Sequence, residues 1–477
     1  MKVTRRQALG LMAGAGVAAG TGCSRILSRL ESKESVSSPQ ASSNRDVIAL
    51  NRFGFGPKPG DLDELRDKGR EKWFEEQLAA PLDDPLPVML RLRQLDIFHF
   101  TAYELRDLPE TEILRQLQTA AILRAVYSPW QLRERMVDFW SNHFNIFARK
   151  GLAAYRKPQD ERDVVRANTL GSFPKMLEAS AKSTAMLLFL DQQASNFSQP
   201  NENYARELLE LHSLGVDGGY TQKDVMEVAR CFTGWTEERG FMKGKGQFRF
   251  RPEMHDSGEK IVLGHVIPKG GGVQDGEKVL EIVSQHPATA SFVAGKLCRF
   301  FLGSSEPKIQ DRVAKAYLSS KGEIKPMLRE IYAAGEEGLA EPFMKRPFDY
   351  LCSSLRALDA DTDGGKPLQD HLTAMGQPLY QWPMPDGYPD VSEAWTGSLL
   401  GRWNFAIDLC EGRIRGTSVD VAGVAKRMGD ADPLAVTFSR PVDSPELDDV
   451  VEIVGRQTLD AAHQAALALA SPEFQWR

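Results

Sequence analysis

The sequence predicts a mainly α-helical, multi-helix globular fold with a small β-hairpin insert. Two observations carry this prediction. Apolar residues recur with helical periodicity through most of the chain after residue 45, whereas the alternation of apolar and polar residues that marks a strand is clear only between residues 247 and 264. The chain shows no internal repeat.

Residues 1–22 have the features of an export signal. A basic start precedes a run of small apolar residues that is too short to span a bilayer comfortably. Residues 4–9 resemble a twin-arginine signal, although Ala8 stands where such signals usually have Phe, and residues 20–23 resemble a lipobox ending at Cys23. We therefore expect an exported protein, held by a lipid on Cys23 at the periplasmic or outer face of the cell envelope. An ordinary cleaved secretory signal with an incidental Cys is the alternative.

The stretch after the signal cannot build a core. Residues 23–44 are rich in Ser, with Glu, Lys, Pro and Gln, and we interpret them as the lipidated Cys and a flexible tether. Twin-arginine export moves folded chains and often serves proteins that carry a cofactor, which favours a bound metal or cofactor. The remaining cysteines are widely spaced in apolar or helical surroundings, so we expect buried free thiols at Cys231, Cys298, Cys352 and Cys410.

Charge and length limit the function and the domain organisation. The formal net charge is −6, and loss of the three basic residues of the signal leaves −9, which argues against a nucleic-acid-binding surface. Residues 45–477 are long enough for a large core and for more than one subdomain. We predict subdomains at 45–240 and 276–477, with the hairpin insert at 241–275.

The helices follow one another along this region. Pro and Gly break the first helical stretch near residue 57, and Asp61 is a plausible N-cap for the next helix. In the insert, residues 247–251 and 260–264 are expected to pair across a turn near residue 257. Helical periodicity predicts further helices at 111–127, 131–147, 164–189, 202–214, 222–233, 276–284, 288–302, 308–321, 324–334, 343–360 and 450–469.

One predicted helix near the middle of the chain combines acids, an arginine and a histidine. On a helical wheel, Asn203, Glu207 and Glu210 lie together beside the buried stripe, and Arg206 lies at their edge. His212 points away from Glu207 by more than ~100°, so this helix does not present Glu and His to one metal. It offers an acidic pair with an amide and a guanidinium beside it.

A solvated helix face is the alternative for this cluster, because Glu202–Arg206 and Arg206–Glu210 are both i,i+4 pairs. The way in which the helix ends favours a site instead. Gly215 closes the helix and Thr221 is expected to cap the next one, so the two helices would form a rigid corner that can hold polar side chains.

Two histidines are further candidates for functional residues. His143 lies in the apolar stripe of its helix between Trp140 and Phe147, where a hydrogen-bonded core histidine is the alternative to a functional one. His255 and Asp256 are adjacent in a predicted turn and suit metal ligation or base-assisted catalysis. An Asp in a turn more often caps its own backbone, which is the structural alternative there.

Two tryptophans occur in segments that suit a binding site. Trp235 follows the glycine that ends the helix at 222–233, and Trp382 lies in a Pro- and aromatic-rich segment at 376–397. We interpret 376–397 as an ordered loop that forms a lid or a pocket wall, with a structural wrap as the alternative. The sequence has no P-loop, no GxSxG, no CxxCH and no zinc-ligand spacing, which excludes several common enzyme classes.

These segments together resemble domain-of-unknown-function family 1800, a bacterial family. Tyr388, where the family often has Trp, is a minor departure. The resemblance implies an exported protein that is often encoded beside members of family 1501, which look like sulfatases or alkaline phosphatases. It brings no activity and no catalytic residue with it. The resemblance covers nearly all of the chain after the signal and is carried by residues 50–57, 139–144, 201–236, 255–264, 286–297, 376–389 and 471–474.

Two functional hypotheses follow. The first is an enzyme, a hydrolase of an envelope or extracellular carbohydrate or ester, in which the polar groups converge on one cleft around a divalent metal with a carboxylate as general base. A redox version with iron or haem is a variant of it. The predicted site comprises catalytic Glu207, Glu210, His143 and Arg206, substrate-binding Asn203, Trp235 and Trp382, and metal-binding His255 and Asp256. The second hypothesis is a non-catalytic envelope scaffold that binds a partner, such as a family 1501 protein, and uses its buried polar groups as structural networks.

Overall fold

The structure is a computed structural model that describes residues 44–238, 246–427, 433–438, 448–455 and 459–477. The predicted signal, most of the predicted tether and the predicted lipidation site at Cys23 lie outside these residues. Within them the fold is mainly α-helical with small two-stranded sheets, as the sequence predicts. No helix in these ranges is both long and apolar enough to cross a membrane. The two predicted subdomains remain a prediction.

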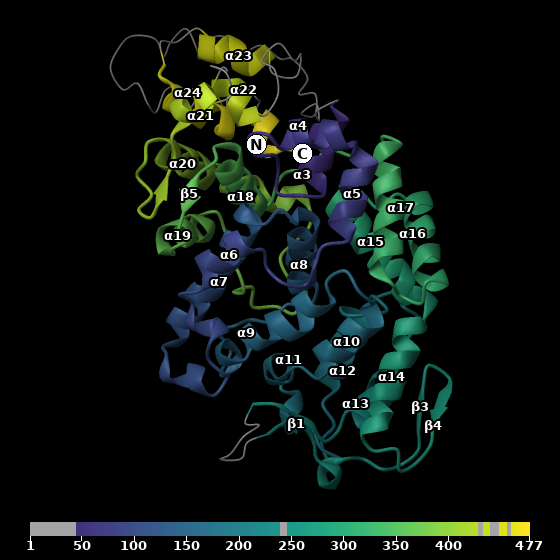
Figure 1. The fold of residues 1–477 in the computed structure, drawn as a ribbon. Helices are drawn as coiled ribbons and strands as arrows, with labels where there is room; N and C mark the ends of the chain where they lie inside the picture. Colours follow the sequence, from purple (N-terminus) through teal and green to yellow (C-terminus); the bar gives the residue numbers. More distant parts are fainter. Residues whose placement is uncertain (1–43, 239–245, 428–432, 439–447, 456–458) are drawn as a thin grey trace.

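The N-terminal part of the described chain builds one flank and the centre of the molecule. Helix α7 lies at this flank and α8 lies in the middle (Figure 1). The elements are α3 (Arg45–Arg52), α4 (Asp61–Lys68), α5 (Arg70–Leu78), α6 (Leu86–Leu92), η1 (Asp96–Phe98), η2 (Glu104–Asp107), α7 (Glu110–Tyr127) and α8 (Gln131–His143). Gly60 is the N-cap of α4, so Asp61 is its first helical residue and the N-cap prediction is wrong by one position.

The predicted helix 164–189 is broken into several shorter pieces. Gly171 and Lys182 lie between them, and the first piece is a π-helix, η4, whose hydrogen bonds join residues five apart. The elements that follow α8 are η3 (Ala153–Tyr155), α9 (Lys157–Asp160), η4 (Glu161–Arg166), α10 (Phe173–Ala181), α11 (Thr184–Phe189), η5 (Gln192–Ala194), α12 (Glu202–Glu210) and α13 (Gln222–Cys231).

The predicted corner between α12 and α13 is present. Thr221 caps α13 through a capping box with Asp224, as predicted. Gly215 has a φ of +82°, and a Cβ there would lie 2.8 Å from the ring of Phe292, so glycine permits both the turn and the close approach of α15 (Pro287–Leu302).

The strands are near their predicted positions, but their pairing is not the predicted one. β2 (Phe248–Phe250) pairs with β1 (Trp235–Glu237), and β3 (Lys260–Val262) pairs with β4 (His265–Ile267). Leu263 and Gly264 both have positive φ and join β3 to β4 in a two-residue turn, which fixes the partner of β3 locally. These hairpins lie at the end of the molecule opposite the C-terminal helices (Figure 1).

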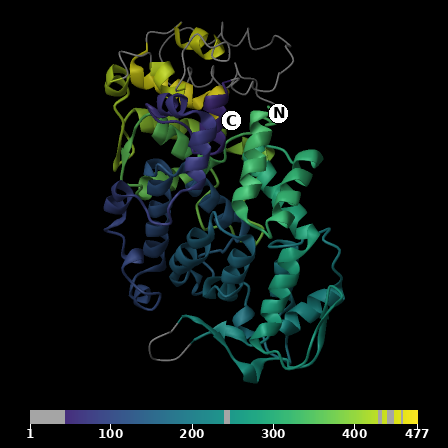
Figure 2. The same ribbon diagram turned by 45° about the vertical axis from the view of Figure 1, so that its right-hand side comes forward.

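The helices after the hairpins stack along one side of the molecule (Figure 2). These helices are α14 (Val273–Gln285), α15 (Pro287–Leu302), α16 (Pro307–Ser319) and α17 (Ile324–Glu336). The short helix η6 (Pro252–Met254) lies between β2 and β3. The remaining elements are α18 (Pro347–Ala357), β5 (Asp361–Thr362), α19 (Lys366–Ala374), η7 (Ser392–Ser398), α20 (Leu399–Cys410), β6 (Thr417–Ser418), α21 (Val421–Arg427), α22 (Pro433–Phe438), α23 (Asp448–Gly455), α24 (Ala461–Ala470) and α25 (Pro472–Gln475).

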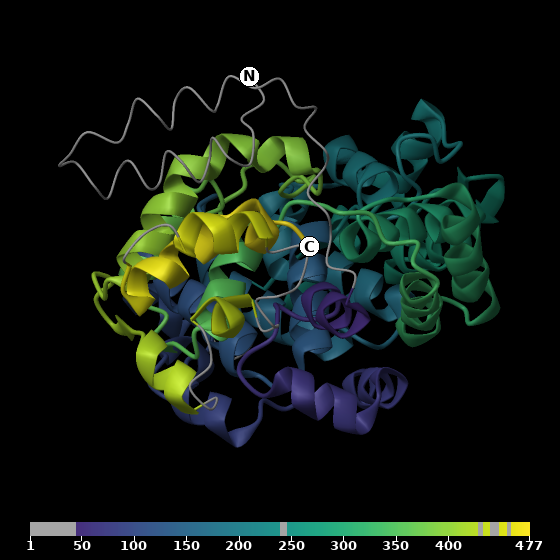
Figure 3. The ribbon, with the colours of Figure 1, turned by 90° about the horizontal axis from the view of Figure 1, so that it is seen from above.

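The C-terminal helices close over the start of the described chain. Seen from above, α3 lies beside the C-terminal residues (Figure 3). Arg52 of α3 donates a hydrogen bond of 2.6 Å to the backbone oxygen of Arg477, and Phe343 exchanges backbone hydrogen bonds with Arg477. The Arg52 contact joins segments that are more than four hundred positions apart in the sequence.

The long helices pack into three hydrophobic clusters. The largest contains the core face of α8 together with α10 to α17, a second contains α18 to α25, and a third lies under α6 and η1. Helix α7 contributes to the second and third clusters, through Ile122 and Ile113 for example. Helices α7 and α8 therefore flank the junction where the three clusters meet. Cys231, Cys298, Cys352 and Cys410 are buried free thiols, as expected.

Candidate functional site

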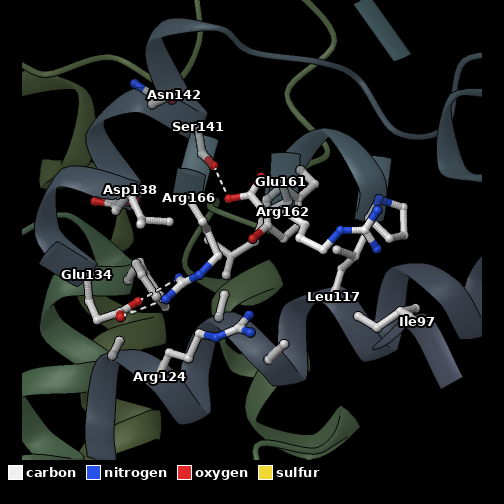
Figure 4. Close-up of a pocket in the computed structure, with 18 of the residues that line it drawn as sticks. Ile97, Leu117, Arg124, Glu134, Asp138, Ser141, Asn142, Glu161, Arg162 and Arg166 are labelled. Atoms are coloured by element: carbon white, nitrogen blue, oxygen red, sulfur yellow. Dashed lines mark hydrogen bonds and ion pairs between the residues drawn. The ribbon is translucent and has the colours of Figure 1, made fainter. Parts of the chain in front are cut away.

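A cavity of about 460 Å³ lies at this junction, between α7, α8, η4 and the loop that follows α19. Figure 4 shows Glu134 and Asp138 on one side of it and Ile97 and Leu117 on the other. Ionisable groups on one wall and apolar groups facing them are what binding sites for small molecules usually offer. None of the residues predicted as catalytic or metal-binding from the sequence lines this cavity.

Helix α8 faces the cavity with polar side chains. Glu134, Asp138, Ser141 and Asn142 fall within an arc of about 100° on its wheel, and all four line the cavity. The opposite face packs into the largest hydrophobic cluster through residues such as Trp140. Because α8 is covered on both sides, its acids sit deep in the molecule rather than on a solvated surface.

Glu134 is held as an anion by two arginines. Arg166 donates two hydrogen bonds of 2.8 and 2.9 Å to its carboxylate, and Arg133 donates two of 2.9 and 3.1 Å. Burial opposes ionisation, but the charges of Arg166 and Arg133 outweigh it and lower the pKa of Glu134 to about 2. Asp84 extends this network, at 2.7 Å from Arg124 and 3.1 Å from Arg166.

Asp138 has the opposite electrostatic character, although it lies one helical turn away from Glu134. Burial raises the pKa of Asp138, and the nearby Asp349 carboxylate raises it further, against the opposing charges of Arg346 and Arg135. Arg346 hydrogen-bonds Asp138 directly. Asp349 is held ionised, because three arginines lower its pKa well below its usual range despite its burial.

The π-helix η4 supplies a third carboxylate. Ser141 donates a hydrogen bond to the Glu161 carboxylate across the cavity wall, as drawn in Figure 4. The other oxygen of Glu161 lies 3.0 Å from the Lys157 ammonium, which is also 2.7 Å from Asp160. Burial opposes the charge on Lys157, but the two carboxylates raise its pKa and keep it protonated. Ser141, Glu161 and Lys157 therefore form one hydrogen-bonded chain leading from the cavity into the protein.

The facing wall is apolar. Ile97 and Phe98 of η1 and Leu117, Ala120 and Ala121 of α7 form it. The Arg124 guanidinium lies over the Phe98 ring at 4.8 Å, at the boundary between the two walls.

The loop after α19 forms a further wall, which confirms the pocket-wall interpretation of segment 376–397. Gln377, Leu379, Tyr380 and Tyr388 of this loop line the cavity. Asn142 fastens the loop to α8 by donating to the Tyr388 carbonyl at 2.9 Å and accepting from its amide at 2.8 Å.

Asn145 is a second fastening point for the same loop. Its side-chain amide donates to the backbone carbonyls of Trp382, at 3.0 Å, and Met384, at 2.6 Å. Trp382 itself is half-buried and hydrogen-bonds Asp386 at 2.8 Å. Trp382 is therefore part of the loop that walls the cavity, although its side chain does not line the cavity.

His143 lies on the core face of α8 and not in the cavity. It is 1% exposed, and its Nε2 lies 3.2 Å from the backbone oxygen of His212. Burial lowers the pKa of His143 well below its usual value, and the nearby Lys296 charge adds to this, so the imidazole is neutral. This arrangement corresponds to the core-histidine alternative.

The acidic cluster on α12 is close to the loop but outside the cavity. Asn203 is exposed, Arg206 bonds Gln222 at 2.7 Å, and Tyr220 donates to Glu210 at 3.4 Å. Burial and the Glu210 charge raise the pKa of half-buried Glu207. The structure thus places Asn203 on the surface and the other three predicted α12 residues on a half-buried face outside the cavity.

Trp235 and the His255–Asp256 pair have structural partners. Trp235 is fully buried beside Phe232 and Phe248. The Nδ1 atom of His255 is 3.1 Å from the Thr233 hydroxyl and its Nε2 atom is 3.1 Å from Asp275, while Asp256 is 2.8 Å from Arg230.

These contacts do not support the metal site predicted at His255 and Asp256. Both ring nitrogens of His255 already have protein partners, and the Asp256 carboxylate is paired with a guanidinium. Across the described residues, no group of three or more His, Cys, Asp or Glu side chains is placed to hold a metal ion.

The sequence contained a signal for the actual cavity wall that was missed. Acids and a serine recur at 134, 138 and 141, which is the helical spacing of one face, directly opposite the apolar stripe of the same helix. A polar stripe is usually solvent-exposed. Burial of this one depends on η4 and the 376–390 loop, which the local sequence does not indicate.

Residues 48–476 match the model of a family described as a protein of unknown function, DUF1800, and the chain belongs to this family. No curated protein and no solved structure matches the chain.

Proposed function

We propose that this protein is an exported, lipid-anchored hydrolase whose chemistry takes place in the cavity between α7 and α8. Carboxyl groups supply acid and base catalysis, and the reaction is cleavage of an ester or glycosidic bond. The observation that carries the proposal is that Asp138, whose pKa is raised by burial, and Glu161, which accepts a hydrogen bond from Ser141, line the same cavity. Two carboxyl groups in different environments at one site can divide the acid and base roles of a hydrolase.

Asp138 is the proposed acid. Its raised pKa favours the protonated form, which can donate a proton to the departing oxygen of the substrate. Glu161 is the proposed base, because it already accepts a hydrogen bond from Ser141 and is placed to take that proton. The Ser141 oxygen would then attack the substrate and form a covalent intermediate while the departing oxygen leaves with the proton of Asp138. A water that gives a proton to the Asp138 carboxylate would attack this intermediate, and Glu161 would return its proton to Ser141 as the second product leaves. Glu134 remains ionised and holds Arg166 in the wall.

The metal of the earlier hypothesis is not needed for these steps. The donors that the wall offers are carboxylates already engaged by arginines, lysine or serine, which suits proton transfer better than ligation of a cation. Proton transfer in the proposed reaction is therefore carried out by the protein's own carboxyl groups.

The test is hydrolysis by the protein lacking residues 1–23, assayed on a panel of nitrophenyl esters and nitrophenyl glycosides. We expect Asp138→Asn and Glu161→Gln to lower kcat/KM by about 10²- to 10⁴-fold. The matched control Glu207→Gln removes a half-buried acid outside the cavity and should change kcat/KM less than about twofold. Hydrolysis at the wild-type rate by both cavity variants, or no hydrolysis of any substrate by the wild type, would refute the proposal.

The export part of the proposal rests on residues 1–23 and has its own test. Mass spectrometry of the protein from its membrane fraction should show a diacylglyceryl group on Cys23. Cys23→Ala should leave the membrane fraction. Recovery of an unmodified Cys23, or a chain that starts elsewhere, would contradict the anchor.

A non-catalytic scaffold is the second candidate, and one observation favours it. Asp84, Arg124, Arg133, Glu134 and Arg166 satisfy one another's charges, as members of a structural network do. In this case the partner would be a family 1501 sulfatase-like protein. Purified together, the two proteins should form a complex that survives Asp138→Asn, while no hydrolysis is detected.

A further inference from the structure

Helix α6 is apolar on both sides, and one side is uncovered. Val88 and Leu92 are buried in the cluster beneath α7. Leu86, Met89 and Leu90 point outward and are 66, 53 and 51% exposed. A surface helix normally has a polar outer face, so three large apolar side chains at i, i+3 and i+4 form an uncovered apolar strip.

This strip starts close in sequence to the cavity. Leu82, four residues before Leu86, lines the cavity and is 69% exposed, so it lies at the rim of the cavity. Arg133 donates a hydrogen bond of 3.0 Å to the Leu82 carbonyl and pairs with Glu134 of the polar wall. These contacts hold the rim residue beside the charged side of the cavity, one short segment before the strip.

The cavity has one apolar wall and one polar wall. Ile97, Phe98 and Leu117 form the apolar wall, and Asp138, Ser141 and Glu161 lie on the polar one. A fully polar ligand would leave the apolar wall without complementary contacts, and a fully apolar one would desolvate the acids without replacing their hydrogen bonds. A ligand with a polar end and an apolar chain satisfies both walls.

We infer that the substrate is an amphiphile, with a polar head among the acids of the cavity and an acyl or alkyl chain that leaves past Leu82 along the exposed face of α6. This inference rests on the proposed function, because it places the scissile bond of the head beside Asp138 and Glu161. The occupant of the α6 strip is thus the tail of the substrate.

The first measurement is kcat/KM for glycerol monoesters with butanoyl, octanoyl and dodecanoyl chains, each below its critical micelle concentration. Each methylene that becomes buried should raise kcat/KM by up to about fourfold, until the chain passes the end of α6. The variant with Leu86, Met89 and Leu90 all replaced by Ser should lose most of this dependence. A control with Val216, Leu318 and Leu400 replaced by Ser, three exposed aliphatic residues away from the cavity, should keep it.

The second measurement separates this inference from the proposed reaction. Glycerol dodecyl ether and glycerol butyl ether carry the same head and cannot be hydrolysed. Titration calorimetry should show at least tenfold tighter binding of the dodecyl ether, lost in the α6 variant and kept in the control.

The outcomes are distinct. Ester hydrolysis with no dependence on chain length would leave the proposed function standing and overturn the amphiphile. Absence of hydrolysis together with chain-dependent ether binding would support the amphiphile and refute the reaction. Equal binding of the two ethers, or binding of the α6 strip to phosphatidylglycerol vesicles with no chain effect, would overturn the inference.

Discussion

Two regions of this molecule concentrate acids on a helix, and they differ in what surrounds the helix. On α12, Glu207 and Glu210 are half-buried outside the cavity, and Arg206 hydrogen-bonds a neighbouring glutamine rather than either acid. On α8, Glu134 and Asp138 are enclosed by arginines and line a cavity. The comparison shows that charge density along a sequence does not locate a site, because the tertiary neighbours decide whether a carboxylate is solvated, paired or made reactive.

The largest contrast should appear in stability. Glu134→Gln leaves the buried guanidinium groups of Arg133 and Arg166 undercompensated, and we expect a loss of about 3–5 kcal/mol in the free energy of unfolding. Glu210→Gln on α12 should change it by less than about 0.5 kcal/mol. Urea unfolding followed by circular dichroism measures both. Similar values for the two variants would remove the distinction between the regions.

Acid should affect the two regions with opposite sign. The pKa of Glu134 is about 2 in the folded protein, below its ordinary value, so its stabilisation is complete above about pH 4.5 and is lost as the pH falls toward 2. The size of this contribution is about 3 kcal/mol. Unfolding free energies measured across this range should fall for the wild type and fall less steeply for Glu134→Gln.

Glu207 provides the reverse case. Its pKa is raised, so ionisation is unfavourable in the folded protein, and protonation as the pH falls should favour folding slightly. The Glu207→Gln variant should lose this small gain. If the acid dependence of Glu207→Gln paralleled that of Glu134→Gln, the assignment of opposite environments would be wrong.

The loop between the two regions offers a smaller effect. Gly387 has a φ of +79°, and a Cβ there would lie 2.3 Å from the backbone oxygen of Asn142. Gly387→Ala should cost about 1–3 kcal/mol and disturb the cavity wall. Gly397→Ala, at a position with open space and no positive φ, is the matched control. Equal melting temperatures for the two variants would argue against this close contact.

The smallest effect concerns Lys296, which lies near His143 and His212. Burial lowers the pKa of Lys296 to about 8, against ~10.4 for an ordinary lysine. Acetic anhydride labelling followed by peptide mass spectrometry should therefore give half-maximal reactivity of Lys296 near pH 8. A midpoint near pH 10 would show that the ammonium is better solvated than its surroundings indicate.

The sequence predicts much of the fold because its signals are local. The capping box of Thr221 and Asp224 and the Pro287 start of α15 each depend on neighbours within a few residues. The partner of β3 was predicted wrongly, because the Leu263–Gly264 turn lies within the predicted strand 260–264 and pairs β3 with the residues directly after it.

The candidate site was less predictable, because its features depend on residues that are far apart in the sequence. The pKa of Asp138 is raised by burial and by the charge of Asp349, which is more than two hundred positions away in the sequence. His143 was a candidate catalytic residue with a hydrogen-bonded core histidine as the alternative, and its ring contacts a backbone carbonyl within the core. The loop 376–397 was correctly expected to wall a pocket, because its prolines and aromatics indicate an ordered segment whatever it covers.

The π-helical winding of η4 has a consequence for comparing members of this family. Bonds between residues five apart fit one extra residue into the turn, and this brings Glu161 and Arg166 together on the cavity wall. In an ordinary helix these two positions would point about 140° apart. A relative that is one residue shorter here could keep every surrounding helix and still lose one of the two groups from its cavity. The length of η4 would then distinguish family members that keep both groups in the cavity from members that keep only the surrounding helices.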